Sequence, residues 1–295
     1  MTIRIEFDKV SVRYPRSADT AVDGVTFSMA GPGIHGVLGR NGAGKTTLLS
    51  VLAAFRKPSA GRVLLDGEPV YENPAAMSRI CLISGGGDTV EHNWPEDRVA
   101  DALTMAALFR PNWSAEYADE LVAKFELAPR KRLSELSRGQ RAQLGCVLGL
   151  ASRAPVTIFD ETYLGMDAPA RHLFYDELLR DYDSHPRLII LSTHLIDEVA
   201  PLLEDVVILH KGRLLVHDDA ETLRGRGAAV TGPADRVDAF IGDRTVLSLR
   251  ELGGTKRATV HGEPWSEQSA LAAGVTVEPL ALQELFVHLT TRGAR

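Results

Sequence analysis

A glycine-rich segment between a short apolar stretch and a helical pattern constrains the fold of this chain more than any other feature. Residues 39–46 read Gly-Arg-Asn-Gly-Ala-Gly-Lys-Thr, after an apolar strand pattern at 34–38 and before helical periodicity over 46–55. Glycines let successive backbone N–H groups curl around phosphate oxygens, and the positive end of the following helix adds to that attraction. The sequence therefore predicts a strand, a phosphate-binding loop and a helix in succession.

The side chains of this loop predict a site for ATP and Mg²⁺. Lys45 is long enough to reach the terminal phosphates, and the Thr46 hydroxyl is a ligand that Mg²⁺ accepts beside phosphates and water. The residues predicted to contact the nucleotide here are Gly39, Asn41, Gly42, Ala43, Gly44, Lys45, Thr46 and Thr47.

A second buried strand pattern, at 156–159, ends in two adjacent carboxylates, Asp160 and Glu161. Neighbouring residues at a strand end point in different directions. Asp160 is therefore predicted to hold the metal, while Glu161 polarises a water for attack on the γ-phosphorus. Taken alone, such a pair is more often a helix cap. Because this pair occurs together with the phosphate-binding loop, we interpret it as catalytic.

Strands alternating with helices predict an α/β fold with a largely parallel sheet. Two alternating segments at 3–14 and 21–29 predict an antiparallel pair at the N-terminus, and 99–109 and 115–125 predict helices. After Ser137 the predicted order is helix 139–152, strand 156–159, helix 168–183, strand 188–192, helix 195–203 and strand 206–210.

A change in the residue pattern after Leu223 predicts a domain boundary. Glycines and a proline there interrupt two weak strands, 228–231 and 245–249, around a helical segment at 234–241. We expect an ATPase domain at 1–224, with a helical subdomain at 88–150, and a small accessory α/β domain at 225–295.

Composition narrows the location and the partners. The net charge of −6 argues against the wide basic surface that nucleic acid needs, so no nucleic-acid partner is expected. No apolar run approaches the roughly 18 residues of a membrane helix. The N-terminus has neither an apolar core nor a small-residue cleavage site of a signal peptide, which favours a cytoplasmic location. Cys81 and Cys146 lack the spacing of a zinc site and are expected to be buried, reduced thiols.

One further motif identifies a family. Leu136-Ser137-Arg138-Gly139-Gln140 precedes a helix and lies about twenty residues before the Asp160–Glu161 pair. In this position it resembles the LSGGQ signature of the nucleotide-binding subunits of ATP-binding cassette (ABC) transporters. The resemblance implies the P-loop cassette fold: a mostly parallel core, an antiparallel N-terminal subdomain and a helical subdomain. It also implies that Ser137, Gly139 and Gln140 contact ATP.

Three more residues match the family in order. Tyr14 resembles the aromatic residue that stacks on adenine, a use that suits its flat apolar ring. Asp167 resembles the aspartate that meets the opposite subunit's phosphate loop. His194 resembles the histidine that contacts the γ-phosphate. Taken alone, Tyr14 reads as a surface residue and His194 as a structural histidine.

The chain also departs from the family pattern. No glutamine occurs before Gln140, although the family places one after the strand at 80–83. Asp88 is a candidate substitute for it. If nothing replaces the amide, ATP hydrolysis is expected to be slower. Arg138 replaces the first signature glycine. Thr162 and Tyr163 stand where proline and threonine are usual.

The resemblance also implies partners. In the family, two cassettes pair head to tail and trap two ATP molecules, so a single chain is incomplete and a homodimer is expected. A separately encoded transmembrane permease would place the pair peripherally on the cytoplasmic face of the membrane. Export is expected because single-cassette chains with a C-terminal extension resemble exporter subunits. The segment 277–289 also resembles the last helix of drug-export subunits. The alternative is that its apolar face simply packs on the tail domain. The alternatives are a regulatory cassette with weak or no hydrolysis, and a P-loop kinase or soluble cassette protein.

Overall fold

The computed structural model describes the chain except for residues 1–2, 16–18, 86–95, 226, 263–266 and 293–295. The chain forms two compact units, of which the first comprises Met1–His194 and Val207–His217, and the second comprises Leu195–Val206 and Asp218–Arg295. The change of unit after His217 comes earlier than the boundary expected at 224, and the second unit also takes a segment from within the expected ATPase domain. A strand at 213–219 runs across the change of unit, and helices at 196–199 and 282–292 pack against each other within the second unit.

An antiparallel sheet in the first unit contains the N-terminal strands. β1 (Arg4–Arg13) pairs with β2 (Thr20–Ala30) and β4 (Ala60–Leu65), and β5 (Glu68–Pro69) completes the order β2-β1-β4-β5. Alternate residues of β1 are buried, as the alternating sequence requires. The antiparallel pair predicted at the N-terminus is therefore confirmed.

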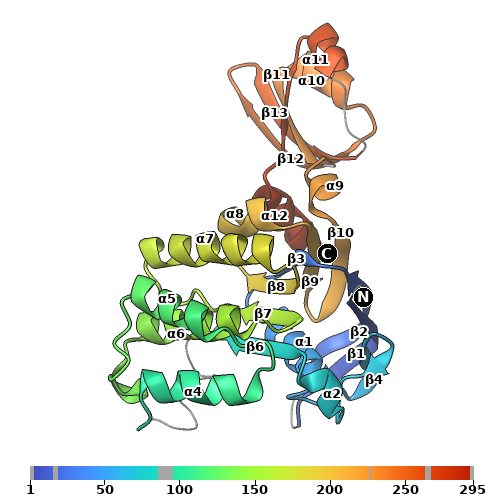
Figure 1. Ribbon diagram of the computed structural model, residues 1–295. Helices are drawn as coiled ribbons and strands as arrows, with labels where there is room; N and C mark the ends of the chain where they lie inside the picture. The colour runs from blue at the N-terminus through green and yellow to red at the C-terminus, as the bar shows by residue number, and fades with distance from the viewer. Residues whose placement is uncertain (1–2, 16–18, 86–95, 226, 263–266, 293–295) are drawn as a thin grey trace. The chain divides into compact units, whose positions relative to one another are not determined.

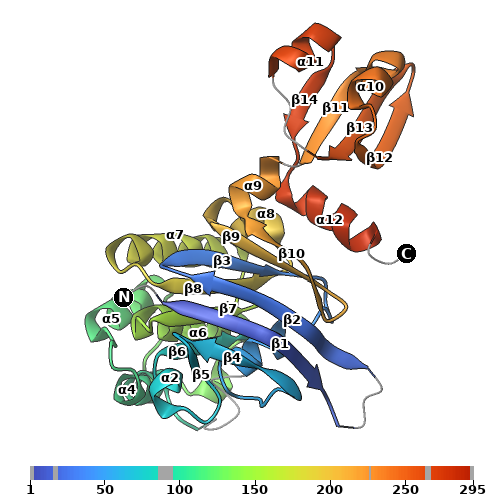
Figure 2. The same ribbon diagram turned by 90° about the vertical axis from the view of Figure 1, so that its right-hand side faces the viewer.

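A second sheet of six strands carries the parallel core (Figure 2). Its order is β10 (Arg213–Asp219), β9 (Asp205–His210), β3 (Gly33–Leu38), β8 (Leu188–Thr193), β7 (Val156–Asp160) and β6 (Ile80–Ser84). Neighbours β3, β8, β7 and β6 run parallel, and the register aligns Leu38 with Thr193 and Asp160 with Ser192. Their carboxyl ends therefore meet at one edge, where ligands bind in sheets of this kind. The sequence did not predict β10.

Helices cover the six-stranded sheet (Figure 1), and those at 99–109, 115–124 and 138–152 fall in the stretch where a helical subdomain is expected. α4 and α5 match their predicted ranges within one residue, and α6 carries Cys146, which is buried and unpaired. One apolar core, including Phe7, Leu48, Ile158 and Ile190, joins both sheets to α1. The helices are α1 (Lys45–Leu52), α2 (Pro74–Met77), α4 (Val99–Phe109), α5 (Ala115–Lys124), α6 (Arg138–Ser152) and α7 (Ala168–Ser184).

The second unit contains a four-stranded antiparallel sheet in the order β12-β13-β11-β14. With its two helices it forms a β-α-β-β-α-β unit, the split βαβ arrangement. The sequence predicted only the first half of it. The elements are β11 (Gly227–Pro233), α10 (Ala234–Ile241), β12 (Thr245–Leu252), β13 (Thr255–His261), α11 (Glu267–Ala273) and β14 (Thr276–Pro279).

The remaining helices of the second unit come from distant parts of the sequence. The helix predicted at 195–203 divides into α8 (Ile196–Val199) and the 3₁₀ turn η3 (Ala200–Leu202), which contains Pro201. α12 (Leu282–Arg292) packs against α8. Leu282, Leu285 and Phe286 form its buried face. α9 (Ala220–Gly225) follows β10, and the Ala220 N–H donates to the Glu204 carbonyl.

Candidate nucleotide site

The phosphate loop runs from the end of β3 to the start of α1, as predicted. Gly44 has φ +100°, and a Cβ there would lie 2.5 Å from the Ala21 carbonyl oxygen. Gly39 is equally confined, because a Cβ would meet the Leu209 carbonyl oxygen at 2.9 Å. Only glycine fits these two positions. A side chain would clash with a carbonyl oxygen at both, and Gly44 in addition has a positive φ that other residues rarely adopt. The loop is further fixed by the Gly212 N–H, which donates to the Ala43 carbonyl at 3.0 Å.

A pocket of about 330 Å³ lies over this loop and the N-terminus of α1. The loop residues share it with Glu161, which comes from the end of β7. The structure thus brings the predicted base to the predicted phosphate site. The lining residues are Ala21, Asn41, Gly42, Ala43, Gly44, Lys45, Thr46, Thr47 and Glu161.

Lys45 lines this pocket and is buried. Its Nζ donates to the carbonyl of Gly39 at 2.8 Å and lies 3.1 Å from Glu161 Oε1. An ion pair between a buried ammonium and a partly exposed carboxylate fixes the orientation of both side chains. Phosphate oxygens entering the pocket would compete with Glu161 for this cation.

Glu161 itself has an uncommon backbone conformation. Its φ is +50°, in the left-handed region that non-glycine residues rarely adopt. Two hydrogen bonds hold the backbone there: the Glu161 N–H donates to the Ser192 carbonyl at 2.9 Å, and the Glu161 carbonyl accepts from the Leu164 N–H at 3.1 Å. Gly85 also lies close, because a Cβ on it would meet the Glu161 carbonyl oxygen at 2.5 Å. These contacts direct the carboxylate toward Lys45.

Asp160 lies next to this carboxylate but is almost fully buried, with 2% exposure. Burial raises the pKa of Asp160, against the nearby Ser192 and Thr46 hydroxyls, which lower it. Among the described residues its Oδ1 has no hydrogen-bond partner. An orphaned carboxylate oxygen beside the Thr46 hydroxyl fits a hard cation such as Mg²⁺. No cluster of three or more His, Cys, Asp or Glu in the described part of the chain could hold a metal, so phosphate and water would complete the set.

His194 follows β8 directly and lies at the same edge of the sheet. Its Nδ1 is 3.6 Å from Glu161 Oε1 and 2.8 Å from the Tyr163 hydroxyl oxygen. Tyr163 was noted in the sequence only as a departure from the family pattern, and its contact with His194 was not foreseen. The departure itself was the one available signal.

Tyr14 lies just after β1 and lines a neighbouring pocket. Its hydroxyl is 3.0 Å from Thr47 Oγ1, which ties the ring to the phosphate loop. The Arg56 guanidinium covers one ring face, 4.3 Å from the centroid. With 37% of the residue exposed, the other face is the one on which an adenine could stack.

The signature segment lies outside the phosphate-loop pocket, since none of its residues is among those that line it. Ser137 caps α6 by accepting from the Gln140 N–H, and Gln140 Oε1 accepts from Lys131 Nζ at 2.9 Å. Gly139 touches the loop that carries Asp167: a Cβ on Gly139 would lie 2.7 Å from the Gly165 carbonyl oxygen. The signature and the Asp167 loop therefore form one surface, separate from the phosphate loop of the same chain.

Two other residues predicted to act in this region are Asp167 and Asp88. Asp167 is the N-cap of α7 and accepts from the Ala170 N–H, so its local role is structural whatever else it contacts. Asp88, the candidate substitute for the missing glutamine, lies outside the described residues. Its role stays a prediction.

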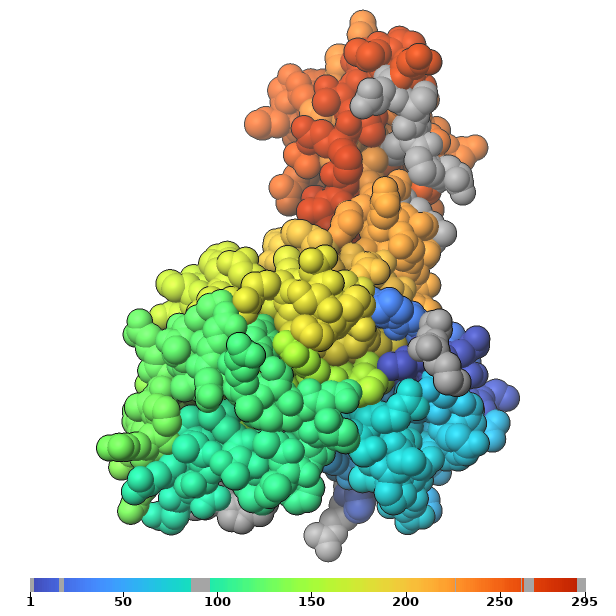
Figure 3. Space-filling model, viewed as in Figure 1, coloured from blue at the N-terminus to red at the C-terminus, as the bar shows by residue number. Residues whose placement is uncertain are grey.

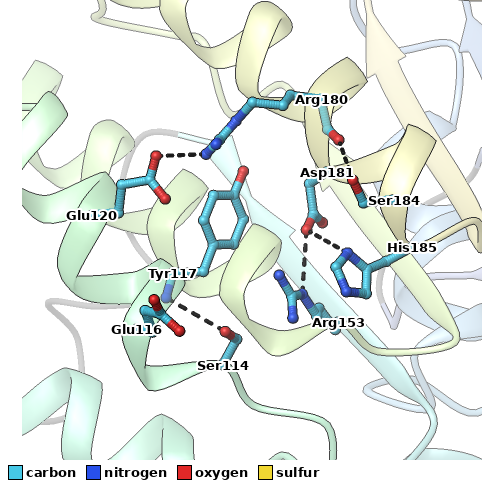
Figure 4. Close-up of a pocket in the computed structure, with 9 residues that line it drawn as sticks. All are labelled: Ser114, Glu116, Tyr117, Glu120, Arg153, Arg180, Asp181, Ser184 and His185. Atoms are coloured by element: carbon cyan, nitrogen blue, oxygen red, sulfur yellow. Dashed lines mark hydrogen bonds and ion pairs between the residues drawn. The ribbon is translucent and has the colours of Figure 1, made fainter.

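A further pocket, of about 180 Å³, lies between α5 and α7, and Figure 4 shows the side chains that line it. Tyr117 lies between two guanidiniums, with Arg153 at 5.4 Å and Arg180 at 5.3 Å from its ring centroid. Arg180 pairs with Glu120 at 2.8 Å and Arg153 with Asp181 at 3.2 Å. The charges of these four side chains thus pair with one another. We interpret it as a structural connection between the two helices.

Comparison with known proteins gives consistent results. The family described as ABC transporter matches residues 22–163. The Nod factor export ATP-binding protein I of Paraburkholderia xenovorans is 33% identical over 216 residues, 71% of this chain and 68% of that protein. The taurine import ATP-binding protein of Pseudomonas fluorescens is 30% identical, over 70% of this chain and 77% of that protein. The daunorubicin resistance ATP-binding protein of Streptomyces coeruleorubidus is 28% identical, over 92% and 91%.

Solved structures agree on the fold. A solved ATP-binding subunit of an ABC transporter gives a TM-score of 0.64 at 23% identity, covering 75% of this chain and 91% of that chain. A dimeric ATP-binding cassette bound to ADP and phosphate gives 0.63 at 18% identity, covering 73% and 98%. The predicted P-loop cassette fold is therefore confirmed.

Proposed function

Because the chain belongs to the ATP-binding proteins of the ABC transporter family, and is an ATPase, we propose that it powers a separate permease as a pair of chains closing on two ATP molecules. The observation that carries this proposal is the split of the predicted ATP contacts over two surfaces. Lys45 and Glu161 meet in one pocket, whereas Ser137 and Gly139 lie with the Asp167 loop. Isologous pairing of two such chains would bring the two surfaces together twice.

In the proposed site the chain's own groups bind and orient ATP. The backbone N–H groups of the loop and Lys45 hold the β- and γ-phosphates, while Tyr14 offers one ring face to the adenine. Thr46 and Asp160 would hold Mg²⁺, which neutralises charge on the phosphates when bound. Ser137 and Gly139 of the partner chain close over the γ-phosphate, and Asp167 meets the opposite loop.

Glu161 is the proposed general base. When phosphate oxygens take Lys45, its carboxylate is free to accept a proton from the attacking water. His194 reaches the γ-phosphate from the end of β8. The alternative of a regulatory cassette with weak or no hydrolysis rests on the glutamine that the sequence lacks before Gln140. Lys45, Asp160 and Glu161 together favour hydrolysis instead.

Steady-state ATPase activity of the purified protein, with and without Mg²⁺, tests this assignment. We expect Mg²⁺-dependent hydrolysis that Glu161→Gln reduces by about 10² or more. Unchanged activity in that variant would show that another group is the base. Hydrolysis only in the presence of an acceptor substrate would favour a kinase.

Export is the proposed direction. The daunorubicin resistance protein matches 92% of the chain, so its likeness extends into the second unit, whereas the Nod factor export and taurine import proteins match 71% and 70%. The permease and a peripheral place on the cytoplasmic face of the membrane follow from the same proposal. Among the described residues, no helix has the length and apolar character of a membrane span.

Helix α4 is the proposed contact for the permease, on the surface of the first unit (Figure 3). Leu108 and Phe109 are 72% and 69% exposed, and Val99 is the one buried residue of this helix. Exposed apolar side chains on an otherwise apolar helix mark interaction surfaces. Such a surface suits an apolar cytoplasmic segment of a membrane protein.

Co-purification from native membranes tests this contact. We expect Leu108→Asp and Phe109→Asp to lose the permease while retaining the ATPase activity of the isolated protein. Leu271→Asp is a matched control, since Leu271 is 77% exposed in the second unit. Equal recovery of the permease with all three variants would contradict the assignment to α4.

A further inference from the structure

Tyr163 is a buried tyrosine between the proposed base and the loop of Asp167. It is 6% exposed, and its ring meets the His194 imidazole edge to face, with centroids 5.7 Å apart. The family that the sequence resembles has other residue types here. Its hydroxyl is the one polar group of the side chain.

That hydroxyl makes two contacts with the same residue. Its oxygen accepts from the His194 backbone N–H at 3.2 Å and lies 2.8 Å from His194 Nδ1. Burial raises the pKa of Tyr163, against the hydrogen bonds of the Thr193 side chain and the His194 backbone, which lower it. The backbone N–H is thus a donor to the tyrosine oxygen.

The direction of the remaining hydrogen bond decides the tautomer of His194. A phenol oxygen has one proton to give, and here it already accepts from the His194 backbone N–H. Donation of the Tyr163 proton to the Nδ1 atom at 2.8 Å satisfies both groups. In a neutral imidazole the other nitrogen, Nε2, then carries the hydrogen.

We propose that Tyr163 is a positioning residue for ATP hydrolysis, which holds His194 as the Nε2–H tautomer and keeps its Nδ1 from the Glu161 carboxylate. The two distances support this: Nδ1 is 2.8 Å from the tyrosine oxygen and 3.6 Å from Glu161 Oε1. A donor at Nε2 is what a γ-phosphate oxygen requires, and an undisturbed carboxylate is what the base requires. The inference rests on the roles proposed above for His194 and Glu161.

Tyr163→Phe tests the proposal by removing one oxygen and leaving the ring. We expect kcat to fall roughly 10- to 100-fold, because the imidazole loses its fixed orientation, while KM for ATP changes by less than about twofold. The ¹⁵N spectrum of the His194 ring should change from a single Nε2–H form to a mixture of tautomers.

Tyr117→Phe is the matched control. Tyr117 is also 6% exposed and its hydroxyl donates to the Glu177 carbonyl at 3.1 Å, but it lies in the pocket between α5 and α7. A merely structural role for Tyr163 would make the two variants equal in kcat. In a His194→Ala background, Tyr163→Phe should cost nothing further.

Three outcomes would overturn the proposal: an unchanged kcat in Tyr163→Phe, an unchanged His194 tautomer, or a loss of the same size in the His194→Ala background. A wild-type kcat for His194→Ala has a different meaning, because it overturns the role proposed for His194 itself. The tautomer measurement separates these cases, since it does not depend on turnover.

Discussion

Lys45 Nζ lies 3.1 Å from Glu161 Oε1 and also donates to the Gly39 carbonyl. The cation proposed to hold the phosphates and the carboxylate proposed to activate water are thus paired with each other. Binding of ATP would exchange this carboxylate for phosphate oxygens, since both are anionic acceptors for one ammonium. The exchange links release of the base to arrival of the substrate.

Glu161→Gln tests this link. The amide cannot accept the proton of water, so we expect kcat to fall by about 10² or more. It also cannot form the ion pair, so Lys45 is left for the phosphates and the affinity for ATP should equal or exceed that of the wild type. Turnover assays and equilibrium binding of ATP at the same Mg²⁺ concentration measure both effects.

Glu126→Gln is the control for that variant. Glu126 has φ +53°, close to the +50° of Glu161, and is exposed, outside the residues that line the nucleotide pocket. The same chemical change in a similar backbone conformation should leave kcat and ATP affinity unchanged. Weaker ATP binding in Glu161→Gln would contradict the proposed competition for Lys45.

Asp160→Asn separates metal binding from stability. Burial raises the pKa of Asp160 in the folded protein. Above that raised pKa the ionised carboxylate lowers the free energy of unfolding. This loss is relieved as the pH falls from the raised pKa to the ordinary pKa of the group. Without Mg²⁺, the neutral amide should therefore leave the melting temperature at pH 7 unchanged or raise it. The Mg²⁺ concentration for half-maximal turnover should rise at least about tenfold, because a hard ligand is lost.

The exposed Asp119 supplies the control, since Asp119→Asn should alter neither quantity. A lower melting temperature in Asp160→Asn together with an unchanged Mg²⁺ requirement would assign Asp160 a structural role.

Two glycines of the phosphate loop should respond differently to alanine. Gly42 has φ +79° with no atom within 4 Å of a Cβ, whereas Gly44 has φ +100° and the Ala21 carbonyl oxygen 2.5 Å away. Gly42→Ala should cost about 1 kcal/mol from backbone strain alone. Gly44→Ala adds a clash and should cost more than about 2 kcal/mol. Denaturant unfolding measures both, and equal costs would show that the loop relaxes around the clash.

Tyr14 gives a prediction about the base of the nucleotide. Tyr14→Ala removes the ring and should weaken ATP binding roughly 3- to 10-fold, whereas Tyr14→Phe loses only the contact with Thr47 and should stay within about threefold. Inorganic triphosphate has no base to stack, so both variants should bind it alike. A loss in Tyr14→Ala that is equal for ATP and triphosphate would exclude stacking on this ring.

The elements that carry the motifs could be predicted because their signals are local. α4 begins at Val99 and ends at Phe109, as the helical pattern of the sequence indicated. The phosphate loop was predictable for the same reason, since its glycines, its strand and its helix are consecutive in the sequence.

Contacts through space were not predictable. Lys45 meets Glu161, and Tyr163 meets His194, only because the strand order places β3, β8 and β7 side by side. No local pattern records that order. The second half of the C-terminal sheet was missed for a different reason: β13 has the mixed sequence TKRATVH, whose strand character comes from its pairing with β11 and β12.

The two-chain ATP site is the central claim, and mixing two inactive variants tests it most directly. Lys45→Ala removes the phosphate-loop cation and leaves the signature intact, and Ser137→Arg blocks the signature and leaves the loop intact. Each variant alone should be inactive. In a mixed pair, one site combines the intact loop of one chain with the intact signature of the other. The account predicts that an equimolar mixture recovers roughly a quarter of the wild-type turnover, as random pairing with one working site per mixed dimer gives. A mixture no more active than the mean of its components, under conditions where mixed dimers form, would contradict it.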